Sequence, residues 1–313
     1  MTTTTGFAAN PALPESAVKR ATRRTKQRLT SRGATIASLI IAVFWTIPTV
    51  GLFITSIRPE TDTLRTGWWN IFINPTVTLE NYINVLNGRD SLLGPFINSL
   101  AISIPATVFP LVIASLAGYA FAWMQFKGRD VLFVLVFALQ IVPIQMALVP
   151  LLSLFSRGLY IGDSVLYEGL RGAGLYSQVW IAHTIFALPL AIFLLHNFIS
   201  EIPADVIEAA RVDGASHGQI FFRIVLPLSM PAIASFAIFQ FLWVWNDLLV
   251  ALIFATGAAA PITRALAELT GEFGQNAELL PAGAFISILV PLIVFLALQR
   301  FFVRGLLAGS TKG

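Results

Sequence analysis

Six long apolar stretches alternate with polar connections along this chain. Each stretch exceeds the roughly 20 residues that a helix needs to cross the hydrocarbon of a bilayer. The pattern predicts an all-α membrane protein whose six transmembrane helices are residues 33–57, 96–123, 131–155, 177–198, 231–255 and 281–303. Proline recurs within these stretches, and the kinks it implies are tolerated only where neighbouring helices or water satisfy the freed carbonyls. Such kinked spans favour a transport pathway over a passive anchor.

The composition agrees with a bilayer environment. Of the 313 residues, 56% are hydrophobic and only 12% are charged, whereas a soluble domain carries about 25% charged residues. The chain has no cysteine, which excludes disulfides, thiolate metal sites and a cysteine nucleophile. Its basic residues cluster at the edges of the predicted spans, so nucleic-acid binding is not expected.

The first 33 residues are polar and become strongly basic before the first span. We predict a disordered tail here and a membrane domain over residues 34–313. The basic segment favours a topology anchor over binding to anionic membrane lipid, although both remain open. A cleaved signal peptide is not expected, because the apolar stretch that follows is too long. The seven cations are Lys19, Arg20, Arg23, Arg24, Lys26, Arg28 and Arg32.

The distribution of Lys and Arg predicts the orientation of the spans. With the N-terminus inside, most of the 20 cations fall on the inner side of the membrane. The positive-inside rule then places both termini and the loop at about 199–229 in the cytoplasm. The outer connections, residues 58–95, 156–176 and 256–280, are long enough to dock an external protein. The alternative is interfacial packing, with Trp68 and Trp69 as belt residues.

Residues 203–227 combine many charges with helical periodicity. Pro203 suits the first turn of a helix, and Gly214 predicts its left-handed end. Ser216 and Gln219 have the spacing of a capping box, which predicts that a second helix starts at once. Four residues fall on one side of the first helix at helical spacing: Ile202, Val206, Ala209 and Ala210. Pro227 and Pro231 are expected to limit the second helix, so that the pair forms a knob for a groove on a partner.

The same loop carries a motif. Glu208-Ala209-Ala210, Gly214 and Ile224-Val225-Leu226-Pro227 satisfy the pattern E-A-A-x3-G-x9-I-x-L-P, which resembles the EAA loop of ABC importer permeases. The resemblance implies a type I importer permease fold in the cell membrane, with coupling helices that contact cytoplasmic ATPase subunits. The residues it assigns to coupling are Glu208, Ala209, Ala210, Asp213, Gly214, Ile224, Leu226 and Pro227.

Candidate substrate contacts lie in the fifth span. Asp247 is an acid inside an apolar stretch, where an ionisable group is a functional hypothesis by default. Gln240, Trp243 and Asp247 are predicted to share one helix face with Asn246 beside them, a combination that suits a sugar. The alternative is that Asn246 and Asp247 bond to a neighbouring helix. Gln140 and Gln145 flank Pro143 in the third span and are candidates to line the same cavity.

The spacing of the histidines and the lack of a phosphate-binding loop argue against metal binding and ATP binding by this chain. His183, His196 and His217 lack metal-ligand spacing, and packing is favoured over proton relay for His183. The chain has no G-x-x-x-x-G-K-[ST] loop, so it is not expected to bind ATP in that manner. We therefore expect no cofactor on this chain, with ATP and Mg²⁺ held by the ATPase subunits.

The resemblance extends along the chain. Trp245-Asn246-Asp247 looks like an element of carbohydrate permeases, and the end from Gln299 to Gly313 is similar to the end of the same group. The nearest likeness is to the second permease of maltose-type sugar importers. It implies a heterodimer with another permease, two ATPase subunits, an extracytoplasmic sugar-binding protein and an oligosaccharide or α-glucoside as substrate. Glycerol-phosphate esters and linear polyols remain open.

Two alternatives of other classes remain at this point. An ion-coupled secondary transporter would work without partners, but no internal repeat supports it. An intramembrane enzyme would use Asp247 and a histidine, but no spaced acid–base cluster supports it.

Overall fold

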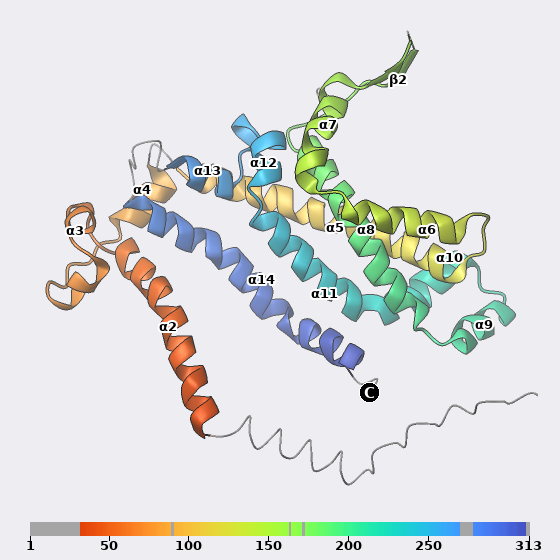
Figure 1. Cartoon of the computed structure of the whole chain (residues 1–313), viewed down its shortest axis with the longest axis horizontal. Helices are drawn as coiled ribbons and strands as arrows, with labels where there is room; N and C mark the ends of the chain where they lie inside the picture. Colours follow the sequence, from red (N-terminus) through yellow and green to blue (C-terminus); the bar gives the residue numbers. More distant parts are fainter. Residues whose placement is uncertain (1–31, 89–90, 163, 171–172, 270–277, 311–313) are drawn as a thin grey trace, which may run out of the picture.

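The computed structural model describes residues 32–88, 91–162, 164–170, 173–269 and 278–310, so the predicted N-terminal tail lies outside it except for its last two residues. Three helices form the centre (Figure 1): α5 (Leu93–Trp123) packs along both α8 (Ser177–Ser200) and α11 (Leu226–Trp245). Helix α14 (Leu279–Ser310) covers α11, and α2 (Arg32–Ser56) packs on α14. The described part of the chain is therefore helical almost throughout, as predicted.

The remaining elements are short and connect these helices. They are α3 (Glu60–Arg65), η1 (Trp68–Phe72), α4 (Glu80–Asn87), α6 (Arg129–Ala138), η2 (Leu139–Ile141), α7 (Ile144–Arg157), β1 (Leu159–Ile161), β2 (Ser164–Tyr167), α9 (Ala204–Val212), α10 (His217–Ile220), η3 (Phe221–Val225), α12 (Leu249–Phe254), η4 (Gly257–Ala259) and α13 (Ile262–Leu269). Strands β1 and β2 form an antiparallel hairpin that projects from the end of α7 (Figure 1).

Within the described residues, five single helices are long and apolar enough to cross a membrane. The predicted third span is not a sixth straight helix, because α6 and α7 meet at an angle of 105°. Pro143 precedes α7, and Val142 is extended with a ψ of 119°. Proline disfavours helical backbone in the residue before it, so the chain breaks here instead of kinking. Helices α6 and α7 together count as a sixth membrane span only if the bent pair is taken as one broken span.

The predicted fifth span also has different limits. The helix runs without interruption from His217 to Trp245, so the prediction that Pro227 and Pro231 end a separate short helix is wrong. Pro227 is the second residue of α11 and lies directly after the irregular turn that precedes this helix. The five residues before α11 form a π-helical turn, η3, which takes up the local irregularity.

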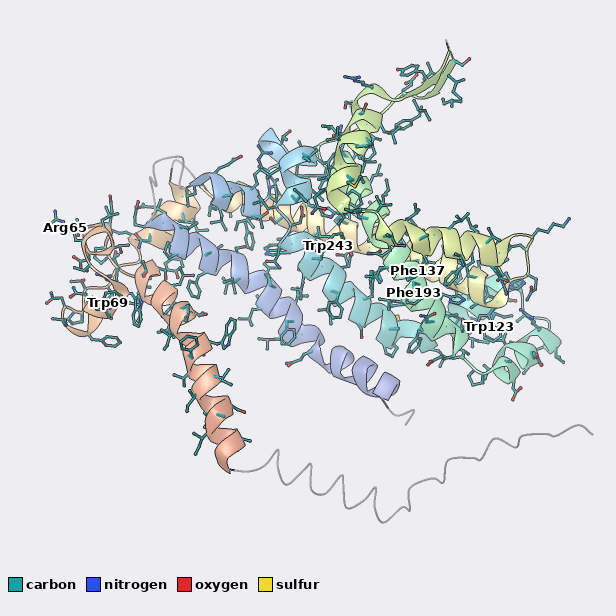
Figure 2. The ribbon with its side chains drawn as sticks, in the orientation of Figure 1. Arg65, Trp69, Trp123, Phe137, Phe193 and Trp243 are labelled. Carbon is teal, nitrogen blue, oxygen red and sulfur yellow. The ribbon has the colours of Figure 1, made fainter. Side chains whose placement is uncertain are left out.

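The molecule has two distinct ends. Helices α3, α4 and α13 gather where α2 finishes and α14 starts, whereas α9 and α10 lie at the far end of α5 and α8 (Figure 1). Figure 2 places Arg65 and Trp69 at the first end and Trp123 at the second. The predicted outer loop and the predicted cytoplasmic loop are therefore at opposite ends of the bundle.

At the first end, the connection after α2 is folded around a buried cation. Arg58 is 1% exposed and donates to the backbone oxygens of Asp62, Thr66 and Gly67, at the C-terminal end of α3. Carbonyls near a helix C-terminus carry partial negative charge, which offsets the buried guanidinium. This connection is thus an ordered structure and not a loose loop.

Three prolines within the spans have their freed carbonyls satisfied by side chains of neighbouring helices. Proline removes the hydrogen bond to the carbonyl four residues earlier. The carbonyl freed by Pro105 belongs to Ala101 and accepts from Trp180 Nε1 at 2.9 Å. The carbonyl freed by Pro110 belongs to Ala106 and accepts from Gln240 Nε2 at 3.2 Å.

The third case lies in α14. The carbonyl freed by Pro291 belongs to Ser287, and it accepts from Trp245 Nε1 at 3.0 Å. Trp245 is 1% exposed and packs against Phe96 and Phe241. The tryptophan of the Trp245-Asn246-Asp247 element is therefore explained by packing, since it holds α11 against the kink of α14.

Candidate coupling surface and translocation cavity

The loop between α8 and α11 has the local structure that its sequence predicts. Gly214 has a φ of +78°. Its N–H donates to the carbonyl of Arg211, and the N–H of Ala215 donates to that of Ala210, both at 3.0 Å. These two bonds form a Schellman motif, which satisfies the last carbonyls of α9 and requires a left-handed residue. Pro203 lies immediately before α9 and not within it.

The predicted capping box is present at the start of α10. The Ser216 side chain accepts from the backbone of Gln219 at 3.4 Å, and the Gln219 side chain accepts from the backbone of Ser216 at 2.8 Å. The box fixes the direction in which the chain leaves the turn at Gly214. Helix α10 then continues through η3 into α11, so the loop is joined directly to a membrane helix.

Helix α9 has a buried side and an exposed side. Ile207 is fully buried in a cluster that includes Leu195, Ile220 and Val225. The four residues at helical spacing do not share one side, because Ile202 is buried whereas Val206 and Ala209 are exposed. Ile207 is the residue that anchors α9. The exposed side leaves apolar surface in contact with solvent, including Val212, which is 87% exposed.

The predicted coupling residues also divide into a partly buried group and an exposed group. Ile224 and Leu226 pack partly buried against that cluster. The others are exposed except for Ala210, which is intermediate: Glu208, Ala209, Asp213, Gly214 and Pro227. One subset therefore fastens the loop to the bundle, and the other forms a small acidic and apolar surface at the end of the molecule.

Three residues that the sequence analysis did not single out, Tyr119, Trp123 and Arg211, take part in the bonds between this loop and the neighbouring helices. The hydroxyl of Tyr119 lies 2.9 Å from His217 Nδ1. Arg211 donates to the carbonyl of Trp123 at 2.9 Å, and the indole of Trp123 donates to the carbonyl of Ile199 at 3.2 Å. A tyrosine and a tryptophan spaced i, i+4 at the end of a span were the available signal.

A cavity of about 450 Å³ lies between α8, α11 and the break that separates α6 from α7. None of the described residues that line it is charged. They are Leu139, Gln140, Val142, Ile144, Ala147, Ile185, Phe186, Ala187, Pro189, Leu190, Phe236, Phe239, Gln240 and Trp243. The break at Pro143 lies at this cavity, since Val142 and Ile144 on either side of the proline line it.

The cavity brings together three of the predicted substrate residues and leaves three outside. Gln140, Gln240 and Trp243 line it, and Figure 2 shows Trp243 where α11 approaches the break. Gln145 is exposed and does not line it. Asn246 donates to the carbonyl of Leu242 in its own helix. Asn246 and Asp247 are not among the residues that line this cavity.

Asp247 lies in a break between α11 and α12 and not inside a continuous helix. Its carboxylate accepts from the backbone N–H groups of Val250 at 3.4 Å and Ala251 at 3.0 Å. Aspartate favours this capping position, because its oxygens satisfy the free N–H groups of a helix start. His183 is 1% exposed, with Nε2 3.8 Å from the Asp247 carboxylate and its ring edge-on to Trp243. Among the described residues, the buried Nδ1 of His183 has no hydrogen-bond partner.

Comparisons with known proteins agree on one family. Residues 111–307 match the sequence profile of the binding-protein-dependent transport system inner membrane component family. The osmoprotective compounds uptake permease protein GgtD of Synechocystis sp. is 55% identical over 284 residues, which cover 88% of this chain and 91% of that protein. The alpha-glucoside transport system permease protein AglG of Rhizobium meliloti is 52% identical over 242 residues, covering 76% and 61%.

The fold agrees with a solved importer. A chain in the crystal structure of a bacterial ABC transporter for import of the acidic polysaccharide alginate superposes with a TM-score of 0.70 at 18% identity, covering 94% of this chain and all of that one. Neither an intramembrane enzyme nor a self-sufficient secondary transporter fits a component of a binding-protein-dependent system. The chain belongs to the binding-protein-dependent transport system inner membrane component family, and it is a multi-pass membrane permease of an ABC importer.

Proposed function

We propose that this chain forms half of the translocation path for an uncharged sugar or sugar-like solute, of the α-glucoside class. The observation that carries the proposal is the cavity, whose described lining combines two glutamines, one tryptophan and apolar side chains without a charge. Relatives named for alpha-glucosides, for osmoprotective compounds and, in Mycobacterium tuberculosis, for trehalose support the same class.

The lining chemistry matches the two faces of a sugar. Glutamine amides both donate and accept hydrogen bonds, as hydroxyl groups require. The ring of Trp243, which is 37% exposed, offers a flat apolar surface for the C–H face of a pyranose. A small number of polar groups set in an apolar wall is the usual composition of a small-molecule site.

The same lining disfavours charged solutes. A phosphate ester or an acidic saccharide placed here would lose its hydration without gaining a counter-charge, and such burial is costly. Of the classes that the sequence leaves open, glycerol-phosphate esters are therefore not favoured, whereas neutral polyols remain close to the proposed class.

We further propose that the exposed side of α9 docks on a cytoplasmic ATPase subunit, and that both chain termini lie in the cytoplasm. A second permease would contribute the other EAA loop and the other half of the path. An extracytoplasmic binding protein would deliver the solute to the end that carries α3 and α4. The partner ATPase subunits would bind ATP and Mg²⁺, and their closure would move the helices as rigid bodies between inward-open and outward-open states.

A competition assay tests the substrate class. Cells that lack this chain, with or without a plasmid copy, would be given radiolabelled trehalose together with unlabelled sucrose, glycerol 3-phosphate or mannitol. We expect uptake that depends on this chain and on the ATPase subunits, with competition by sucrose and none by glycerol 3-phosphate. Competition by the phosphate ester alone would contradict the proposed class, and uptake without the ATPase subunits would contradict the importer assembly.

A further inference from the structure

Helix α5 is held at two places that the proposed function leaves unconnected. Its last turns contact the loop between α8 and α11 at about 199–229, which we call the coupling loop. Its middle, where Pro105 and Pro110 lie, contacts the cavity wall. The segment between Ala106 and Trp123 is about 25 Å long at the usual rise of a helix, so it spans much of the bundle.

At the loop end, two side-chain hydrogen bonds join α5 to different helices of the coupling loop. Tyr119 is 4% exposed, and its hydroxyl is 2.9 Å from Nδ1 of His217 in α10. Arg211, in the last turn of α9, donates to the carbonyl of Trp123, the last residue of α5. A cation at this position also compensates the negative end of the helix dipole of α5.

At the cavity end, the bond partner of α5 is a cavity residue. The carbonyl of Ala106, freed by Pro110, accepts from Gln240, which is 3% exposed and lines the cavity. The carbonyl of Ala101 is held in the same way by Trp180 of α8. Movement of this kink would therefore carry Gln240 with it or break its hydrogen bond.

The coupling loop is also connected to α11, and that connection differs from its hydrogen bonds to α5. The loop continues into α11 through η3, and a π-helical turn is often a point at which helices bend. A loop attached through that turn alone could tilt without moving α5. The bonds of Tyr119 and Arg211 add two directed contacts with the central helix to the packing of Ile207 and the chain connection to α8.

We infer that α5 transmits movement of the coupling loop to the cavity, with Tyr119 and Arg211 as positioning residues at the loop and Gln240 as the positioning residue at the cavity. The inference rests on the proposed function, since it takes the loop to be what the ATPase subunits move. It adds a route through side chains that the EAA motif does not specify.

The test uses a reporter in the cavity of the complete importer. The chain has no cysteine, so Val142→Cys, at a lining position 49% exposed, gives one labelling site when the partner subunits are also cysteine-free. The rate of maleimide labelling is measured without nucleotide and after trapping with ATP and vanadate. Tyr119→Phe removes only the hydroxyl, and Arg211→Gln removes the cation at an exposed position.

Tyr176→Phe is the matched control. It also removes one hydroxyl bonded to α5, the 2.6 Å bond to Asn98, but at the opposite end of the helix. We expect trapping to change the labelling rate in the reference chain and in Tyr176→Phe. In Tyr119→Phe and Arg211→Gln, that change should be smaller by about threefold, the order expected for loss of one hydrogen bond, while ATPase subunits still co-purify.

Three results would overturn the inference, and they differ in what else they overturn. Full responses in both Tyr119→Phe and Arg211→Gln would remove the route through α5 and leave the proposed coupling intact. If the change in labelling rate fell as much in Tyr176→Phe as in the other two variants, the loss of any hydrogen bond to α5 would be sufficient to reduce it, and the specific route would be wrong. A reference chain that does not respond to trapping, although assembled, would remove the proposed coupling and this inference with it.

Discussion

Replacement of Gly214 by valine is expected to abolish transport while the chain still inserts in the membrane. Gly214 has a φ of +78°, a conformation that costs an ordinary L-residue roughly 1–2 kcal/mol and is a stronger outlier for a β-branched one. No atom lies within 4 Å of the position that a Cβ would take. The damage should therefore come from the backbone conformation alone, which would undo the Schellman motif and misplace the exposed side of α9.

The matched variant is Gly214→Asn, which adds a side chain of similar size in the same open space. Asparagine tolerates the left-handed region better than other residues with a Cβ, so it should retain most of the transport. Uptake per copy of chain in the membrane, together with co-purification of the ATPase subunits, is the measurement. Equal activity of the valine and asparagine variants would show that the turn at Gly214 does not position a docking surface.

Replacement of Trp243 by alanine is expected to raise the half-saturating substrate concentration about tenfold, with less effect on the maximal rate. Loss of an aromatic wall that contributes about 1.4 kcal/mol of binding energy corresponds to that factor. Trp243→Phe keeps a flat ring and should show a smaller change. The assay is initial uptake of radiolabelled trehalose over a range of concentrations.

The control for this variant is Trp69→Ala, because Trp69 is 61% exposed and lies at the end of the molecule away from α9 (Figure 2). If Trp243→Ala left the half-saturating concentration unchanged, this half of the importer would hold few substrate contacts. The proposed role of the cavity would then be wrong, although the coupling role would stand.

The sequence predicts best those features that depend on a few neighbouring residues. Gly214 and the pair of Ser216 and Gln219 each specify a turn or cap through local bonds, so their roles follow from residue type and spacing. The apolar lengths of the spans are equally local. That is why the helical membrane fold and the geometry of the loop could be predicted in advance.

Features that depend on distant partners could not be predicted in the same way. Pro143 lies at a break between two helices, whereas α5 continues through Pro110. There the freed carbonyl of Ala106 accepts from Gln240, which is 134 residues from Ala106 in sequence. Asp247 looked like an intramembrane acid because its run of apolar neighbours hides the break that it caps. The contact at Pro110 joins segments that are distant in sequence, whereas the cap formed by Asp247 is local. The apolar pattern of the sequence indicates neither.

The central claim is that the exposed side of α9 meets a cytoplasmic ATPase subunit. A photo-crosslinking amino acid at position 209 of the assembled importer tests it most directly, with position 165 of the β1–β2 hairpin, also exposed, as the control. The account predicts an adduct with the ATPase subunit from position 209 and none from position 165. An adduct from position 209 with an extracytoplasmic protein, or an ATPase adduct from position 165 alone, would contradict it.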